Sequence, residues 1–302
     1  MKRCMLAGVS VFAALVVSHP ATLQSQAIER SMYVSVVDKT GAPVPNLGPA
    51  DFIVREDNLS REVLRVVPNT DPMQIAILVD NSTAAAPLIQ HIRRALPAFL
   101  ETLTKPTASG RRNEVTIVTL GSRPTILADY SIDPAPLTKA VDRLWEETLN
   151  SGYYLLNGII ETSQGFKKRE ATRPVIVAIT GEGAELSSRH PDQVLTPLRD
   201  SGAALHVISI GLPSAGISDD ERYRNRVVDE GPRVSGGMHA QLLAASALPL
   251  KLEQLANVLT HSYRVVYAHP DSLVPPQRIT VAARRPDLTA FGSPEKGQQA
   301  RR

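Results

Sequence analysis

The run QIAILVDNST, from Gln74 to Thr83, decides the fold. An unbroken apolar segment leads directly into Asp80 and a cluster of small polar residues. Apolar runs of this length are typical of a strand that is buried on both faces of a parallel sheet. Sheets of this kind place their ligand sites at the carboxyl ends of the strands. We therefore expect Asp80 and Ser82 to emerge at a ligand site.

Strands and helices alternate after this run. Two more apolar stretches predict buried strands at 174–180 and 205–211. Apolar residues at helical spacing predict helices at 87–103, 135–147, 154–168, 192–201 and 248–262. The alternation predicts an α/β domain over residues 71–260, with a mostly parallel sheet and helices on both faces. The polar segment 214–233 shows no convincing pattern, and we expect a mobile loop or a short exposed helix there.

The segments on either side of this domain follow a different pattern. Residues 28–70 and 261–290 contain short stretches in which polar and apolar residues alternate, as in half-buried antiparallel strands. We expect the two segments to form one small β-sandwich-like lobe, into which the α/β domain is inserted. The polar tail, residues 291–302, is predicted to be disordered.

The first 27 residues are typical of a secretory signal peptide. Lys2 and Arg3 precede a short apolar core, and small residues follow it. The core is shorter than the roughly 20 residues of a membrane span, although an uncleaved anchor remains the alternative. We expect an exported protein, periplasmic or secreted, without a stable membrane span after cleavage. The single cysteine, Cys4, lies in this leader, so the mature chain would have no disulfide or thiol nucleophile.

The composition excludes several classes of function. The chain has 33 Lys and Arg against 30 Asp and Glu, a formal charge of +3, which gives no electrostatic support for a nucleic-acid partner. Neither a G-x-x-x-x-G-K-[ST] phosphate loop nor a G-x-S-x-G nucleophile turn is present. No set of catalytic residues stands out, and we expect a protein that is not an enzyme.

Four marks along the chain carry a resemblance to a known family. They occur in order as VVDKTGAPV at 36–44, the strand and acidic turn at 75–82, the segment 175–183, and the paired stretches 263–267 and 278–281. The order resembles the von Willebrand factor A domain family, and more closely its bacterial exported members. The resemblance implies a Rossmann-like α/β fold and an interaction or adhesion-type module that binds another protein.

The resemblance also implies a site for Mg²⁺ or another divalent cation. In the family, the ligands are D-x-S-x-S after the first strand, a threonine from a loop and a later aspartate. Here Asp80 and Ser82 match the first two positions, but the third is Ala84. The threonine corresponds to Tyr153 and the later aspartate to Gly181. A hard cation needs more oxygen ligands than the two that remain, so we predict a degenerate site that holds no cofactor.

We refer to the three loops at residues 80–84, 151–154 and 180–182 as the mouth. The leading hypothesis is that a protein partner docks there without a metal ion. The residues assigned to this contact are Asp80, Asn81, Ser82, Thr83, Tyr153, Tyr154 and Glu182. The two tyrosines suit either a contact surface or packing into the vacated metal position.

Three other interpretations of the mouth remain open. Glu182 could join Asp80 and Ser82, with nearby hydroxyls such as that of Ser151, in a weaker cation site. Asp80 and Ser82 also suit a capping pair that binds the N–H groups of the following turn. An exported serine hydrolase acting through Ser82 would need a histidine brought from a distant part of the chain.

Overall fold

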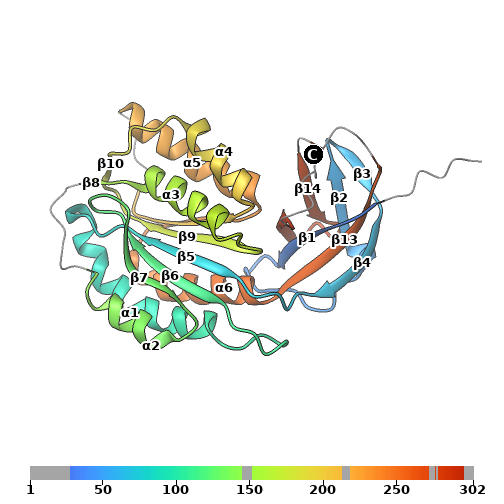
Figure 1. Cartoon of the computed structure of the whole chain (residues 1–302), viewed down its shortest axis with the longest axis horizontal. Coiled ribbons are helices and arrows are strands. Elements are labelled where there is room, and N and C mark those ends of the chain that lie inside the picture. Colours follow the sequence, from blue (N-terminus) through green and yellow to red (C-terminus); the bar gives the residue numbers. More distant parts are fainter. Residues whose placement is uncertain (1–27, 145–151, 213–217, 272–275, 277, 296–302) are drawn as a thin grey trace, which may run out of the picture.

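The computed structural model describes residues 28–144, 152–212, 218–271, 276 and 278–295. The predicted signal peptide and Ser151 lie outside the described residues. Figure 1 shows an α/β domain with a β lobe at one end of it. No helix in the described ranges has the length and apolar character needed to cross a bilayer.

The predicted parallel sheet is present, and β5 lies inside it. The strand order is β12-β11-β9-β5-β6-β7, and every neighbouring pair is parallel except β6 with β7. Within this register, Ile77 of β5 lies opposite Ile117 on one side and Val177 on the other. The strands of this sheet are β5 (Gln74–Val79), β6 (Glu114–Thr119), β7 (Thr125–Ser131), β9 (Pro174–Thr180), β11 (Ala204–Ile210) and β12 (His239–Leu242).

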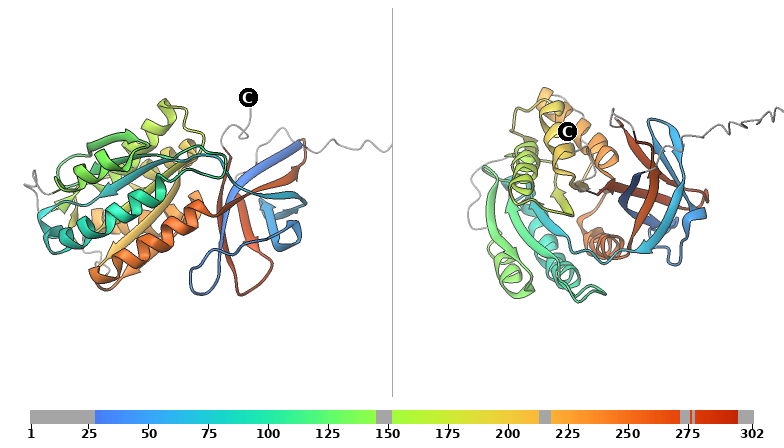
Figure 2. Two further views of the ribbon diagram at one scale, coloured as in Figure 1. Left: turned by 90° about the horizontal axis from the view of Figure 1, so that it is seen from below. Right: turned by 45° about the vertical axis from the view of Figure 1, so that its right-hand side comes forward.

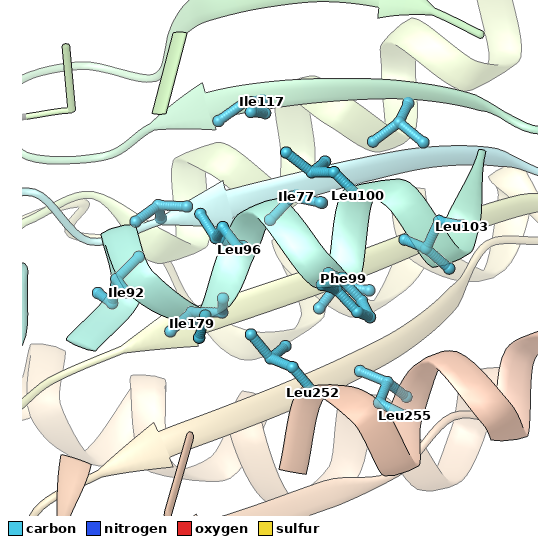
Figure 3. Close-up of a cluster of buried hydrophobic side chains, with 14 of the residues drawn as sticks. Ile77, Ile92, Leu96, Phe99, Leu100, Leu103, Ile117, Ile179, Leu252 and Leu255 are labelled. Atoms are coloured by element: carbon cyan, nitrogen blue, oxygen red, sulfur yellow. The ribbon is translucent and has the colours of Figure 1, made fainter. Parts of the chain in front are cut away.

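Helices cover both faces of the sheet, which explains why its strands are continuously apolar. The α-helices are α1 (Ala86–Leu103), α2 (Pro134–Val141), α3 (Leu155–Lys168), α4 (Pro191–Ser201), α5 (Asp219–Ser235) and α6 (Leu248–Thr260). The 3₁₀ turns are η1 (Pro49–Asp51), η2 (Thr83–Ala85) and η3 (Ala245–Ala247). Helices α1, α2 and α6 pack on one face, where Ile77, Phe99 and Leu252 share a core (Figure 3). Helices α3, α4 and α5 pack on the other face.

Helix α5 corrects the prediction for residues 214–233. Its described residues form a 17-residue helix, not a mobile loop or a short exposed one. The sequence hides it because most of its positions are polar, and only a narrow stripe that includes Val227 and Val228 reaches the core. Its ends are nevertheless marked, by the Ser218 and Glu221 capping box and by Gly236 at φ 79°.

The β lobe consists of two antiparallel sheets with a shared core. One sheet has the order β15-β1-β13-β4, and the other has the order β14-β2-β3. Met32, Phe52 and Tyr267 are buried between them. The strands are β1 (Ile28–Val37), β2 (Phe52–Glu56), β3 (Leu59–Arg61), β4 (Val63–Pro68), β13 (Ser262–His269), β14 (Ile279–Ala283) and β15 (Thr289–Pro294). Figure 2 shows that the first and last described strands lie together in this lobe.

Strand β15 corrects the prediction of a disordered tail from residue 291. Residues 289–294 pair antiparallel with β1, and Glu295 forms an ion pair with Arg264. Gly292 permits this pairing because a Cβ there would clash with the Tyr33 carbonyl oxygen. The partner strand lies more than 250 residues earlier, so a local pattern did not reveal it. Residues 296–302 lie outside the described part of the chain.

Arg173 fastens the lobe to the α/β domain at the amino end of the sheet. Its guanidinium donates to the carbonyl oxygens of Asp71 and Leu259 at 2.9 and 3.2 Å and to Ser262 Oγ at 2.6 Å. The Tyr33 ring lies 5.1 Å from the guanidinium carbon. The buried charge is thus held by fixed dipoles from both parts of the chain.

Candidate functional site

The mouth lies at the carboxyl end of the sheet, away from the lobe (Figure 1). Asp80 follows β5, and Gly181 follows the neighbouring strand β9. The short strands β8 (Gly152–Tyr153) and β10 (Ala184–Glu185) pair beside this edge. A Cβ placed on Gly183 would lie 3.0 Å from the Tyr153 ring and 3.3 Å from Ala84 Cβ, so the three loops meet in space.

Asp80 is a buried carboxylate that already binds two loop N–H groups. Its side chain accepts from the Ser82 N–H at 2.9 Å and from the Gly181 N–H at 3.3 Å. Burial raises the pKa of Asp80, while these N–H groups, the Ser82 hydroxyl and the charge of Arg224 act in the opposite direction. Asp80 therefore makes the contacts expected of a residue that caps the following turn.

Ser82 and Asn81 are buried as well, but their polar atoms differ in their contacts. Asn81 accepts from the Gly121 N–H at 2.8 Å and so ties the end of β5 to the end of β6. The Ser82 hydroxyl is fully buried and makes no hydrogen bond of normal geometry among the described residues, although it lies close enough to Asp80 to lower the pKa of that carboxyl. It therefore does not share in the capping, and no histidine bonds it as a serine hydrolase acting through Ser82 would require.

Tyr153 is 1% exposed, so its ring is not available to a docking partner. The side chain packs in the core between the sheet and helices α3 to α5. Its hydroxyl accepts from Arg224 Nη1 at 3.3 Å, and the same nitrogen donates to the Gly183 carbonyl oxygen at 3.0 Å. Of the two roles predicted for Tyr153, its burial favours packing.

Arg224, on α5, brings a buried positive charge to the mouth. Among the described residues, no carboxylate lies within 4.0 Å of its guanidinium, whose other donors bond to Asn225 Oδ1. Its charge nevertheless lowers the pKa of Asp80 and of Glu185. A buried arginine without a close ion-pair partner is uncommon, and this one places a positive charge beside the carboxylates of Asp80 and Glu185.

The exposed part of the mouth is made by other residues. Thr83 and Ala84 are exposed on the turn after β5, and Tyr154 is half-buried at the start of α3. Glu182 is also exposed, but its carboxylate turns toward the end of β11, where it accepts from the Leu212 N–H at 2.6 Å. These residues form a rim around the buried carboxylate of Asp80.

Comparison with known proteins bears on the fold. No protein-family model matches the sequence, and neither does any curated protein sequence. The vWF domain of the type V pili tip protein Mfa5 from Porphyromonas gingivalis matches with a TM-score of 0.50 and 10% identity, over 63% of this chain and 96% of that domain. The α/β domain has the von Willebrand factor A fold.

Two further solved structures are similar to this chain with lower TM-scores. A von Willebrand factor type A protein from Catenulispora acidiphila has a TM-score of 0.48 and 10% identity, over 90% of this chain and 73% of that chain. Proximal thread matrix protein 1 from the mussel byssus has a TM-score of 0.45 and 18% identity over 71% of this chain. This chain covers 50% of the length of the mussel protein.

The side chains at the mouth of this A fold are poorly suited to a magnesium ion. The positions at Ala84 and Gly181 offer no side-chain oxygen, and the Tyr153 hydroxyl is bound to Arg224. Position 181 does face the site, because a Cβ there would lie 3.6 Å from Asp80 Oδ2. The positive charge that acts on Asp80 comes from Arg224 and would repel a cation at the same carboxylate. The Ser82 hydroxyl is the remaining group that makes no hydrogen bond of normal geometry in the described part of the chain.

A second buried carboxylate, Glu185, supports the mouth from behind. It accepts from the N–H groups of Leu155 at 3.2 Å and Ser187 at 2.9 Å, and thereby caps the start of α3. Burial raises the pKa of Glu185 to about 7. A carboxyl group next to the mouth therefore has a pKa near neutral pH.

The sequence analysis missed Arg224 and Glu185. Arg224 lies on α5, in a segment predicted to be a mobile loop or a short exposed helix, and the capping box at Ser218 offered a signal for the longer helix. Glu185 follows the mouth by three residues and carries no motif. Both residues are buried beside the site, and their burial depends on how the elements pack in the tertiary structure.

Proposed function

We propose that the chain is a module that binds another protein at the mouth without a bound metal ion. The observation that carries this proposal is the placement of Arg224 behind Asp80, since a fixed positive charge there reduces the need for a cation. The von Willebrand factor A fold of a pilus tip protein supports an interaction role by analogy of fold alone.

The contact surface in this proposal is the exposed rim of Thr83, Ala84, Tyr154 and Glu182. The buried residues Asp80, Asn81, Ser82 and Tyr153 hold the rim in place from below. A rim held on a sheet edge by buried hydrogen bonds suits a pre-formed protein contact. Binding at this surface requires no bond-making chemistry.

The rim is tested with charge-reversing variants in a quantitative binding assay. A biotinylated chain captures a partner from the extracellular fraction of its source, and the captured partner is then purified for titration. Thr83→Arg and Glu182→Lys should each weaken binding at least tenfold, while Ser109→Arg, in a loop at the opposite end of the sheet, should not. Retention of full affinity by both rim variants would sink the proposal.

Metal independence is tested separately. An ion present at 100 times its Kd would stabilise the chain by about 2.7 kcal/mol. We expect Mg²⁺, Mn²⁺ and Ca²⁺ at millimolar concentration to leave the free energy of unfolding unchanged. The Ser82 hydroxyl, which makes no hydrogen bond of normal geometry with the described residues, favours the competing function, a cation-dependent module that uses Asp80, Ser82 and Glu182. A stabilisation that Ser82→Ala abolishes would establish this alternative.

Export is the remaining part of the proposal, and it rests on the sequence of residues 1–27. Expression in a bacterium that secretes through the general pathway should give a mature chain that begins near residue 28. Mass spectrometry of the intact secreted protein measures this start directly. A full-length chain that stays in the cell would contradict export.

A further inference from the structure

A cavity of about 210 Å³ opens beside the mouth, between helix α5 and the carboxyl ends of β9, β11 and β12. Polar side chains line its sheet side: Thr180, Ser209, His239 and Gln241. Ser209 lies in register with Thr180 on one side and Gln241 on the other. The neighbouring positions on this face, such as Val207, are buried and apolar, so the polar group is confined to the cavity.

Three of the residues around this cavity lie in a row, joined by one hydrogen bond and one ion-pair contact. Ser209 Oγ lies 3.1 Å from His239 Nε2, and His239 Nδ1 lies 3.4 Å from Asp229 Oδ1 on α5. The tautomer protonated at Nδ1 donates to Asp229 and leaves Nε2 as the acceptor for the Ser209 hydroxyl. A hydroxyl, an imidazole and a carboxylate in this order have the roles of nucleophile, base and orienting group.

The surroundings suit these roles. Burial lowers the pKa of His239, and Asp229 partly opposes this, so the imidazole is neutral at pH 7 and able to accept a proton. Thr180 lines the same cavity and offers a hydroxyl donor for a developing oxyanion, and the charge of Arg224 lies in the same lining. A bond that served only to hold β12 would not need a cavity, because β12 is already paired with β11 along its length.

We propose that Ser209 is the nucleophile of an acyl-transfer site in this cavity, with His239 as its general base and Asp229 as the residue that orients His239. The substrate class is an ester of a small carboxylic acid, because the free volume of about 210 Å³ limits the acyl group. This proposal departs from the expectation that the chain is not an enzyme. The rim shares Glu182 with the lining of this cavity, so Thr83→Arg, at a residue outside the lining, tests partner binding apart from this proposal.

The reaction balances with water as the second substrate. Ser209 Oγ bonds to the acyl carbon as its proton moves to His239 Nε2, and the carbonyl electron pair moves onto oxygen. When the tetrahedral adduct collapses, the ester C–O bond breaks and the proton passes from His239 to the leaving alcohol. Water then attacks the acyl-serine with His239 as base, releasing the carboxylic acid and restoring the Ser209 hydroxyl.

The first experiment uses the unchanged full chain and an alkyl fluorophosphonate that carries a fluorophore. The reagent labels serines that are activated by a base, and peptide mass spectrometry locates the adduct. We expect one adduct, at Ser209. An adduct at Ser82 would overturn this assignment in favour of the hydrolase hypothesis for Ser82, and the absence of any adduct would overturn the proposal as a whole.

Variants then measure the role of each residue against the labelling rate. Ser209→Ala should abolish labelling, while the matched control Ser109→Ala, an exposed serine at the other end of the sheet, should leave it unchanged. His239→Ala should slow labelling about 100-fold, the contribution of a general base. Thermal unfolding shows whether each variant is folded. Folded His239→Ala that labels at the wild-type rate would refute the role of His239.

Asp229 is tested by a pH profile, because a merely structural residue would not shift one. The other charged side chains that line the cavity are Arg224 on α5 and Glu182 after β9. Asp229 raises the pKa of His239, so Asp229→Asn should move the half-maximal labelling rate to lower pH. It should also slow labelling roughly tenfold, since an exposed carboxylate is screened by solvent. An unchanged pH profile would remove Asp229 from the proposal.

Discussion

Buried arginines lie at both ends of the central sheet, and their surroundings differ. Arg173, at the amino end, is surrounded by carbonyl oxygens and a hydroxyl that join the lobe to the α/β domain. Arg224, at the carboxyl end, lies among the titratable groups Asp80, Tyr153 and Glu185 and beside a cavity. Two equally buried arginines thus differ in role: Arg173 joins the lobe to the α/β domain, and Arg224 lies beside the candidate site.

The difference lies in what each guanidinium can respond to. The donors of Arg173 meet fixed dipoles, although its charge also acts on the neighbouring Tyr33 and Asp71. The charge of Arg224 acts on carboxylates whose protonation changes, and free volume beside it leaves room for a partner group. Four predictions test this contrast, in order of decreasing expected effect.

Arg173→Ala should cause the largest loss of stability, about 4 kcal/mol. The change removes the donor to the carbonyl oxygens of Asp71 and Leu259 and leaves Ser262 Oγ with a single 3.4 Å contact from Asn69, and each unsatisfied group costs about 1–3 kcal/mol. The measurement is urea unfolding of the variant and of Arg173→Lys, which should recover part of the loss. A loss below about 1 kcal/mol would mean that the joint does not depend on Arg173.

The pH dependence of stability should come from the carboxyl end. The pKa of Glu185 rises from 4.5 to about 7 on folding, so between these values the folded chain binds more protons than the unfolded chain. Stability therefore falls as pH rises through this window, by about 3 kcal/mol in total.

Glu185→Gln measures this contribution, because glutamine keeps an acceptor for the N–H groups but does not titrate. Unfolding free energies at pH 4, 6 and 8 should differ between variant and wild type by an amount that grows with pH and levels off above pH 7. A parallel pH dependence in the two proteins would show that Glu185 does not titrate in this window.

Arg224→Met should destabilise the chain by about 2 kcal/mol at pH 8, through loss of its bonds to Tyr153 and Gly183. The loss should be smaller at pH 5, where Glu185 is protonated and no longer benefits from a nearby positive charge. Urea unfolding at the two pH values measures the difference. An equal loss at both pH values would show that the charge of Arg224 does not act on Glu185.

Two serine-to-alanine changes give the smallest and most direct comparison. Ser262→Ala at the joint removes the acceptor at 2.6 Å from Arg173 and should cost about 1 kcal/mol. Ser82→Ala at the mouth removes a hydroxyl that makes no hydrogen bond of normal geometry among the described residues and should change stability by less than about 0.5 kcal/mol. A comparable loss for both, measured by thermal unfolding, would show that Ser82 has a structural bond.

The order of strands and helices could be predicted from the sequence because apolar periodicity is a local property. The strand at 174–180 matches β9, and the helix at 248–262 matches α6 to within two residues at its end. The full length of helix α5 was not predicted because most of its residues are polar, and only a narrow stripe that includes Val227 and Val228 joins the core. Strand β15 was missed because its register is set by β1, at the other end of the chain.

The order of apolar runs along the chain was enough to predict the fold class. An apolar run such as Ile75 to Val79 is buried wherever it folds, and the residue after it must emerge at the strand end. The contacts that the residues at the strand ends make depend on the tertiary structure. The charge of Arg224 behind Asp80, and the contact of Ser209 with His239, depend on distances between elements that the order of residues along the chain does not specify.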